Sequence, residues 1–346
     1  MLGRSASVLV LLLGLTVPGM LSAHGAVADE LGTRLCVVTP PAPTSVTRFT
    51  GADRFAVSAA VSASTFPEDV PVAVIASGST FPDALAGGAA AGRLEAPLLL
   101  VGPGDEAPAA VQAELTRLNP EKIIVLGGTA SISTTLELTM ERFAPTVRRV
   151  AGADRFEVSA ALAQLVFATE ARTIYVASGE VFPDALSAAA AAGDAAGPVL
   201  LVRKNEIPPA VESYLAGQRR ISQIVVLGGP ATISESVTRS LAERAPLKAI
   251  GGADRYAVSA ATSGYQFCSE SPIVFIASGE VFPDALSGSA AAIARSAPVL
   301  LVSKNGLPPA VSQELGRLNP QQIVVLGGEN TISKAIELDL ANYLRS

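Results

Sequence analysis

The chain has 346 residues, of which 49% are hydrophobic, and it carries a formal net charge of −6. A chain of this length and composition can bury a large core, so we expect a globular protein with two or three domains. Its acidic charge, its few aromatic residues and its lack of tryptophan argue against a surface that binds single-stranded nucleic acid.

The first 28 residues are predicted to be a signal peptide for export. Arg4 supplies a positive charge, Val8–Val17 an apolar core, and the sequence Ala-Val-Ala a small-residue cleavage site after Ala28. Cleavage after Ala23 is the alternative. The apolar run is shorter than the roughly 20 residues that span a bilayer, and no other stretch could span one. We therefore expect a secreted protein with no membrane span after cleavage.

The mature chain is expected to begin with a linker over residues 29–43, which ends in a proline-rich stretch. The two cysteines of the chain, Cys36 and Cys268, can form a disulfide outside the cell, although their number leaves unpaired thiols equally open. The one histidine, His24, precedes the expected cleavage site. Its removal would exclude Ser-His-Asp and Cys-His catalysis and most transition-metal sites from the mature protein.

Three copies of one unit fill the rest of the chain. The sequence GADR begins at Gly51, Gly152 and Gly252, and the sequences FPDAL and LGG follow it in the same order each time. The period of about 100 residues is the size of a domain. We therefore predict three similar domains, at residues 44–143, 144–244 and 245–346.

Strands and helices are predicted to alternate within each copy. In the first copy, the strands are expected at residues 45–50, 72–77, 96–101 and 122–127, and the helices at residues 53–64, 82–93, 108–118 and 133–143. Continuous Val, Ile and Leu runs are typical of parallel strands buried on both faces. Each domain is therefore predicted to be an α/β unit, in which helices flank a small parallel sheet. The second helix consists almost wholly of small residues, so we expect it to be buried, where it could form an interface between domains.

The recurring motifs follow the strands, at the edge of the sheet where parallel α/β proteins bind ligands. Most of them also have a structural explanation. A proline followed by an aspartate suits the first turn of a helix, where the backbone N–H needs no partner and the helix dipole favours negative charge. We assign this structural role to Pro82, Asp83, Pro183, Asp184, Pro283 and Asp284. The LGG glycines are expected to provide positive φ in a tight turn.

The GADR motif places an aspartate and an arginine side by side at a strand-to-helix turn. The aspartate can cap the helix, whereas the arginine has five donors in a fork that fits a carboxylate or a phosphate. An internal ion pair and an anion-binding group are equally open interpretations. They apply to Asp53 with Arg54, Asp154 with Arg155, and Asp254 with Arg255.

The loop after the third strand differs among the copies. It is basic in the second and third copies, where it contains Arg203, Lys204 and Lys304, and acidic in the first copy. The net charges of the three domains, −5, 0 and −1, also set the first copy apart. A polyanion is therefore expected to prefer the second and third domains.

No catalytic set is apparent in the repeats. Without histidine only carboxylate pairs or Ser-Lys remain, and the carboxylate pairs lie within single elements and match poorly between copies. Three copies of a weak site give avidity for a repetitive ligand, whereas an enzyme gains little from them. We therefore expect a binding protein that uses neither a cofactor nor a metal.

Taken in order, GADR, ASG-x-x-FPDAL, the PLLLV or PVLLV strand and LGG-x-x-x-IS resemble the cell wall-binding repeat 2 family over residues 44–346. The resemblance implies an exported protein of a Gram-positive bacterium that is anchored non-covalently to the wall, usually through an anionic wall polysaccharide. It also implies a Toprim-like fold for each repeat and packing of the three repeats around a pseudo-threefold axis. No effector domain is apparent beside the repeats.

The family associates a Pro-hydrophobic-Leu-Leu motif with polymer binding. The resemblance extends this role to Leu99, Leu100, Leu200, Leu201, Leu300 and Leu301. Their sequence context predicts core strand residues, so their effect could be indirect, through the loop that follows. Toprim enzymes hold magnesium with acidic residues, but no Asp-x-Asp follows a strand here, so metal-dependent catalysis is not carried over. The alternatives to a wall anchor are a peptidoglycan hydrolase or its modifier and a soluble protein that binds a small anion or sugar.

Overall fold

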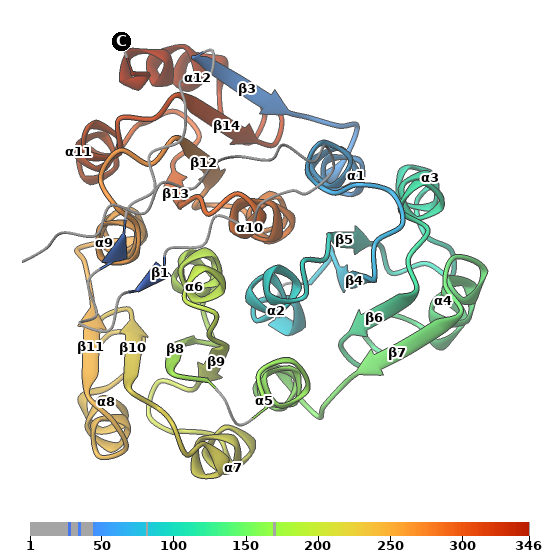
Figure 1. The fold of residues 1–346 in the computed structure, drawn as a ribbon, viewed down its shortest axis with the longest axis horizontal. Helices are drawn as coiled ribbons and strands as arrows, with labels where there is room; N and C mark the ends of the chain where they lie inside the picture. Colours follow the sequence, from blue (N-terminus) through green and yellow to red (C-terminus); the bar gives the residue numbers. More distant parts are fainter. Residues whose placement is uncertain (1–26, 29–33, 36–43, 81, 169–170, 346) are drawn as a thin grey trace, which may run out of the picture.

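A computed structural model of the protein describes residues 27–28, 34–35, 44–80, 82–168 and 171–345. Three four-stranded parallel sheets, each with its helices, surround a common centre (Figure 1). A separate antiparallel pair joins β1 (Val27–Ala28) to β2 (Arg34–Leu35). Cys268 is disulfide-bonded. Its expected partner Cys36, most of the predicted signal peptide and His24 lie outside the described residues, so the pairing and the cleavage site stay predictions.

Each sheet with its helices is called a module here. Module 1 has the sheet order β5-β4-β6-β7. It comprises α1 (Arg54–Thr65), β4 (Val72–Ser77), η1 (Pro82–Ala84), α2 (Gly87–Arg93), β5 (Leu98–Val101), α3 (Ala109–Leu118), β6 (Lys122–Leu126), α4 (Thr134–Thr139), η2 (Met140–Arg142) and β7 (Thr146–Val150). The parallel sheet and the flanking helices confirm the predicted fold class.

Modules 2 and 3 repeat this plan, with the sheet orders β9-β8-β10-β11 and β13-β12-β14-β3. Module 2 comprises α5 (Arg155–Val166), β8 (Thr173–Ser178), α6 (Pro183–Asp194), β9 (Val199–Val202), α7 (Pro209–Gly217), β10 (Gln223–Leu227), α8 (Glu235–Ala242) and β11 (Leu247–Ile250). Module 3 comprises α9 (Arg255–Gln266), β12 (Ile273–Ser278), α10 (Pro283–Ala294), β13 (Val299–Val302), α11 (Pro309–Leu318), β14 (Gln322–Leu326), α12 (Lys334–Leu340), η3 (Ala341–Tyr343) and β3 (Ser45–Phe49).

The sequence repeats and the modules differ by one strand, so the expectation that each repeat forms its own sheet is wrong. The first strand of a repeat pairs in parallel with the last strand of the preceding repeat, as β7 does with β6 and β11 with β10. The physical reason is that the helix after β6 or β10 returns the chain to the sheet that it has just left, as βαβ units usually do. The strand β3 has no preceding repeat. It pairs with β14 from the other end of the chain and so closes a ring of modules.

The helices α2, α6 and α10 occupy the centre of the ring, where they contact one another and their own sheets (Figure 1). They consist mainly of Ala, Gly and Ser, and α6 and α10 are buried over most of their length. Small side chains let three helices approach one axis closely. This arrangement agrees with the predicted burial of the small-residue helix and with the predicted pseudo-threefold packing, whereas the Toprim-like label stays a prediction.

The start of the second helix of the first copy differs from the prediction. The helices α6 and α10 begin at the FPDAL proline, but in module 1 this proline begins the short 3-10 helix η1 and α2 starts only at Gly87. The first copy has tandem glycines, Gly87 and Gly88, as the first two residues of α2, where glycine weakens a helix relative to alanine. In the part of the chain that the structure describes, no helix is both long and apolar enough to cross a bilayer.

Candidate functional site

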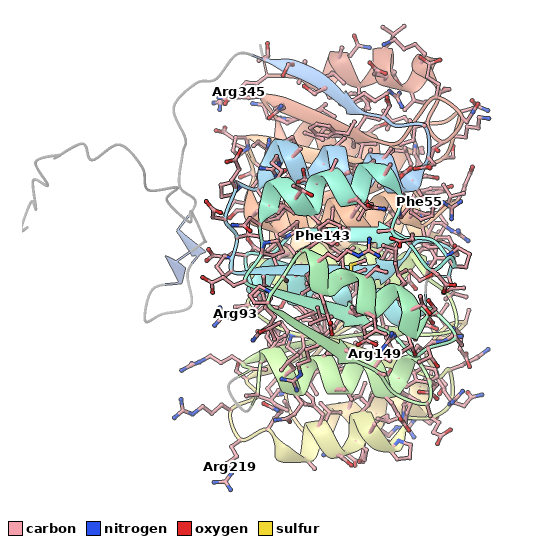
Figure 2. The ribbon with its side chains drawn as sticks, turned by 90° about the vertical axis from the view of Figure 1, so that its right-hand side faces the viewer. Phe55, Arg93, Phe143, Arg149, Arg219 and Arg345 are labelled. Atoms are coloured by element: carbon pink, nitrogen blue, oxygen red, sulfur yellow. The ribbon has the colours of Figure 1, made fainter. Side chains whose placement is uncertain are left out.

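The loops that follow the strands gather at one end of the molecule. In the side view of Figure 2, Phe55 in the first turn of α1 lies toward one end, whereas Arg93 at the end of α2 and Arg219 before β10 lie at the opposite end. We call the first of these ends the carboxyl edge. It carries the GADR, FPDAL and LGG loops and the loop after the third strand of all three modules, so the predicted site residues share one face.

The aspartate of each GADR motif caps the helix that follows it. One oxygen of Asp53 accepts hydrogen bonds from the backbone N–H groups of Phe55 and Ala56, at 3.0 and 2.8 Å. Asp154 and Asp254 cap α5 and α9 in the same way. An aspartate at this position satisfies N–H groups that have no partner inside the helix. The capping interpretation therefore accounts for this half of the motif.

The arginine of each GADR motif reaches a different partner, the loop after the second strand. Its Nη1 atom donates to a glycine carbonyl at 2.6 Å in every module, from Arg54 to Gly78, from Arg155 to Gly179 and from Arg255 to Gly279. The arginine thus fixes the start of the FPDAL loop, and part of its donor capacity serves the fold. The anion-binding interpretation of the arginines stays a prediction.

The FPDAL aspartate lies directly beneath the LGG turn of the same module. The first glycine of each turn has positive φ, 104° at Gly127, 109° at Gly228 and 96° at Gly327, as predicted. A Cβ atom at Gly327 would lie 2.2 Å from an oxygen of Asp284, and the corresponding distance to an aspartate oxygen is 2.6 Å in the other two modules. The two motifs therefore form one structural unit, because the aspartate occupies space that only glycine leaves free.

Burial changes the acidity of these carboxyl groups. The exposed fractions of Asp184 and Asp284 are 6% and 7%. Desolvation raises the pKa of Asp284 to about 6, and the Arg54 guanidinium of module 1 partly offsets the rise. Desolvation also raises the pKa of Asp184, against the opposing effects of Arg255 from module 3 and a hydrogen bond with Thr232. The loops of neighbouring modules are thus coupled electrostatically across their boundary.

These aspartates have the surroundings of structural groups. Asp83 accepts a hydrogen bond from the Ser131 hydroxyl at 2.6 Å, and Ser131 belongs to the same LGG loop that covers it. A general acid must reach a substrate atom within hydrogen-bond distance. Asp184 and Asp284 are almost fully buried and lie directly against the first glycine of their LGG turns. The structural role expected for these aspartates stays a prediction.

The loops after β9 and β13 place exposed cations on the carboxyl edge. Lys204 and Lys304 are both exposed, and neither ammonium group has an ion-pair partner within the described residues. Arg203 is engaged, because its Nη2 atom lies 3.0 Å from Oδ2 of Asp154 and its guanidinium carbon lies 4.4 Å from the centre of the Phe156 ring. Of the three predicted loop cations, the two lysines are therefore the ones available to a ligand.

The corresponding loop of module 1 presents the opposite charge. Asp105 accepts a hydrogen bond from the Ser133 hydroxyl at 2.8 Å, and Glu106 forms an ion pair with Arg142 at 2.8 Å. This loop, residues 102–106, contains no lysine or arginine. The predicted difference in charge between the first copy and the others is therefore a feature of the folded surface.

The leucines that the family resemblance assigns to polymer binding are core residues. All six have an exposed fraction of 0%: Leu99, Leu100, Leu200, Leu201, Leu300 and Leu301. They lie in β5, β9 and β13. A side chain without accessible surface cannot contact a polymer, so their assignment as direct ligand-binding residues is wrong. Any effect on binding acts through the loop that follows each strand.

The sequence did not predict that an arginine in β7, the strand that the next repeat contributes to module 1, holds the LGG turn. In module 1, Nη1 of Arg149 donates to the Gly127 carbonyl at 2.8 Å and Nε donates to Glu137 at 2.9 Å. Because Arg149 belongs to the second sequence repeat and Gly127 to the first, no pattern within one repeat reveals the contact. The arginine three residues before the GADR glycine, present in the first and second copies as Arg48 and Arg149, was the available signal.

An equivalent arginine clamp, meaning one arginine that contacts both the LGG turn and a glutamate of the following helix, holds β3, the strand that closes the ring. Nη1 of Arg48 donates to the Gly327 carbonyl at 2.8 Å, and its Nε atom lies 2.5 Å from Glu337, with side-chain exposures of 9% and 13% for the pair. Module 2 lacks the clamp, because Ala249 and Thr238 occupy these positions. The carboxyl edge is therefore held differently in module 2.

Within the described residues, His, Cys, Asp and Glu side chains form no group of three or more that could hold a metal ion. The expectation that the protein needs no metal or cofactor stays a prediction, and so does the expectation that it is not an enzyme.

Two curated relatives from Bacillus subtilis (strain 168) are similar to most of this chain. The N-acetylmuramoyl-L-alanine amidase LytC is 26% identical over 312 residues, which are 90% of this chain and 61% of the relative. A protein named amidase enhancer is 26% identical over 295 residues, which are 85% of this chain and 40% of the relative. The chain thus spans less than two thirds of the length of either relative.

Solved structures with the same fold come from Clostridium difficile. Cwp6 superimposes with a TM-score of 0.81 at 22% identity, covering 92% of this chain and 51% of that protein. Cwp8 gives a TM-score of 0.77 at 23% identity, covering 86% and 52%. The family described as cell wall binding domain 2 (CWB2) matches this chain at residues 48–137, 149–238 and 249–337. These three matches, one in each predicted repeat, cover more than half of the chain and show that it belongs to the cell wall binding domain 2 family.

Proposed function

We propose that this protein is an exported, non-enzymatic wall protein that binds an anionic wall polymer through the carboxyl edge, above all through Lys204 and Lys304. The observation that carries the proposal is an exposed lysine at the same loop position in modules 2 and 3, whereas the corresponding loop of module 1 is acidic. Ammonium groups that face water without an internal partner can pair with the charges of a polyanion. Two such groups on one rigid ring add their effects when the ligand is repetitive.

Several features support an anchor over an enzyme. The family is a cell wall binding domain by description. The predicted signal peptide supports export to the compartment where a wall polymer is present. The carboxyl groups of Asp184 and Asp284 are almost fully buried against their glycine turns. The proposal therefore assigns the charged loops to binding and the buried aspartates to folding.

The test is binding of the purified mature chain to isolated Gram-positive walls before and after their anionic polymers are extracted. We expect binding to fall on extraction, to weaken with salt, and to drop severalfold in Lys204→Ala or Lys304→Ala and further in the double variant. Lys122→Ala is the matched control, because Lys122 is an exposed lysine that begins β6 at the opposite end of the molecule. Equal binding to both wall preparations, or equal losses in the control, would contradict the proposal.

A peptidoglycan hydrolase or its modifier is the second candidate, because one relative is named as an amidase and another as an amidase enhancer. A zymogram with the purified chain decides between them. Lysis by the wild type that is lost in Asp184→Asn and Asp284→Asn, with folding intact, would favour the function of a hydrolase over that of an anchor. Tight calorimetric binding of a monomeric sugar or anion would instead favour a soluble binding protein.

A further inference from the structure

The three central helices are not interchangeable where they meet. Gly92, Gly193 and Ile293 occupy equivalent positions in the three repeats. A Cβ atom on Gly92 would lie 2.5 Å from the Cδ1 and Cγ2 atoms of Ile293, and a Cβ atom on Gly193 would lie 2.3 Å from Cδ1 of the same side chain. One isoleucine from module 3 therefore fills the space that two glycines, from modules 1 and 2, leave open.

A second layer lies one helical turn earlier and follows the same rule. Its equivalent residues are Gly88, Ala189 and Ser289, of which Ala189 and Ser289 have exposed fractions of 1% and 0%. A Cβ atom on Gly88 would lie 2.0 Å from Oγ of Ser289 and 3.2 Å from Cβ of Ala189. Module 1 again contributes the smallest residue and module 3 the largest. The layer has room for one particular set of three side chains.

The junction between modules 2 and 3 carries a buried polar link of its own. The Tyr175 hydroxyl donates to Oε1 of Gln266 at 2.6 Å, and Nε2 of Gln266 donates to Asp194 at 2.6 Å. Tyr175 has an exposed fraction of 0% and Gln266 one of 3%. At the junction of modules 1 and 2 the positions of Tyr175 and Gln266 are taken by Val74 and Val166. A valine opposite Tyr175 would leave its hydroxyl group buried without this partner.

We propose that the axial surfaces encode the order of the repeats: each repeat fits its two different neighbours in this chain and does not fit a copy of itself. Three isoleucines at the position of Ile293 would overfill a space that holds one, and three glycines there would leave it empty. These three positions are partly buried, and close contacts between helices tolerate neither overfilling nor the loss of a side chain well. The partner that the surface of each central helix fits is therefore a different repeat of the same chain.

The test enlarges one residue and reduces the facing residue of another repeat in the full mature chain, and it measures urea unfolding. Gly88→Ala is expected to lower the unfolding midpoint because of the clash with Ser289, and Ser289→Gly because of the space it leaves. The double variant Gly88→Ala with Ser289→Gly is expected to recover more than half of the summed losses. Gly316→Ala is the matched control for the change of glycine to alanine in a helix, since a Cβ atom there meets nothing within 4 Å.

A second pair moves the isoleucine itself, Gly92→Ile with Ile293→Gly. Recovery in both double variants is the expected result, and it stays measurable if a single variant fails to fold, because the double variant should then restore folding. Losses that simply add, or a double variant that also fails to fold, would overturn the proposal, since residues that share no space show additive effects. The outcome does not depend on what the carboxyl edge binds.

Discussion

Replacing Asp284 by asparagine is expected to stabilise the protein at neutral pH and to have little effect in acid. Burial raises the pKa of Asp284 to about 6 from an ordinary value of 3.8. A folded-state pKa above the unfolded one means that the folded protein binds this proton more tightly. The stability linked to this group is therefore fully present below about pH 4 and is lost as the pH rises through about 6. The difference corresponds to about 3 kcal/mol at neutral pH.

The assay is urea unfolding of the wild type and of Asp284→Asn at several pH values between 4 and 8. We expect the free energy of unfolding of the variant to exceed that of the wild type by up to about 3 kcal/mol above pH 7, and the two curves to converge toward pH 4. Asp83→Asn serves as the comparison, because Asp83 is only half-buried and accepts a hydrogen bond from Ser131. A variant that is less stable than the wild type by the same amount at every pH would refute the reasoning, since the carboxylate would then be stabilising the fold.

Three further changes test the structural assignments by unfolding and binding. Arg48→Met removes one partner of the largely buried pair with Glu337 and should cost about 3–5 kcal/mol, with faster proteolysis of the strand β3 as a second readout. Gly327→Ala should cost at least about 1–3 kcal/mol from its positive φ, with a further cost from contact with the aspartate below, whereas Gly328→Ala, which meets nothing within 4 Å, should be nearly neutral. Leu200→Ala should cost about 2–5 kcal/mol through a cavity, and the folded fraction should still bind walls, unlike a variant of a direct contact residue.

The elements of each module follow from local patterns in the sequence. The apolar runs in β4 and β5 become buried strands because both faces of the sheet are covered by helices. The aspartate of GADR caps its helix because its side chain needs only the two N–H groups that follow it. The tight turn after β6 requires the positive φ of Gly127. In each case the interaction lies within a few residues, so one stretch of sequence is enough to predict it.

The contacts that join motifs could not be predicted in this way. The glycine at Gly327 is required as much by Asp284 beneath it as by its own backbone, and these residues are far apart in the chain. The contact of Arg149 with Gly127 crosses from one repeat to the next. Each repeat shows the same motifs, so sequence alone gives no sign that a strand belongs to the sheet of its neighbour. The assignment of Leu200 to polymer binding was wrong for a related reason, because a family motif does not separate contact from support.

The closing strand connects the N-terminal end of the ring to the loop that carries Lys304. The backbone N–H of Gly327 donates to the Phe49 carbonyl at 2.9 Å, so β3 holds the LGG turn of module 3 in addition to the contact of Arg48 with this turn. The same LGG loop ends at Ser333, whose N–H donates to the Lys304 carbonyl at 2.9 Å. In module 2 the equivalent strand β11 follows β10 in the chain, whereas β3 comes from the other end of the chain than the three strands that it completes. The loop that carries Lys304 is therefore held by a strand from the other end of the chain, whereas the corresponding loop of module 2 lies in a module whose four strands follow one another in the sequence.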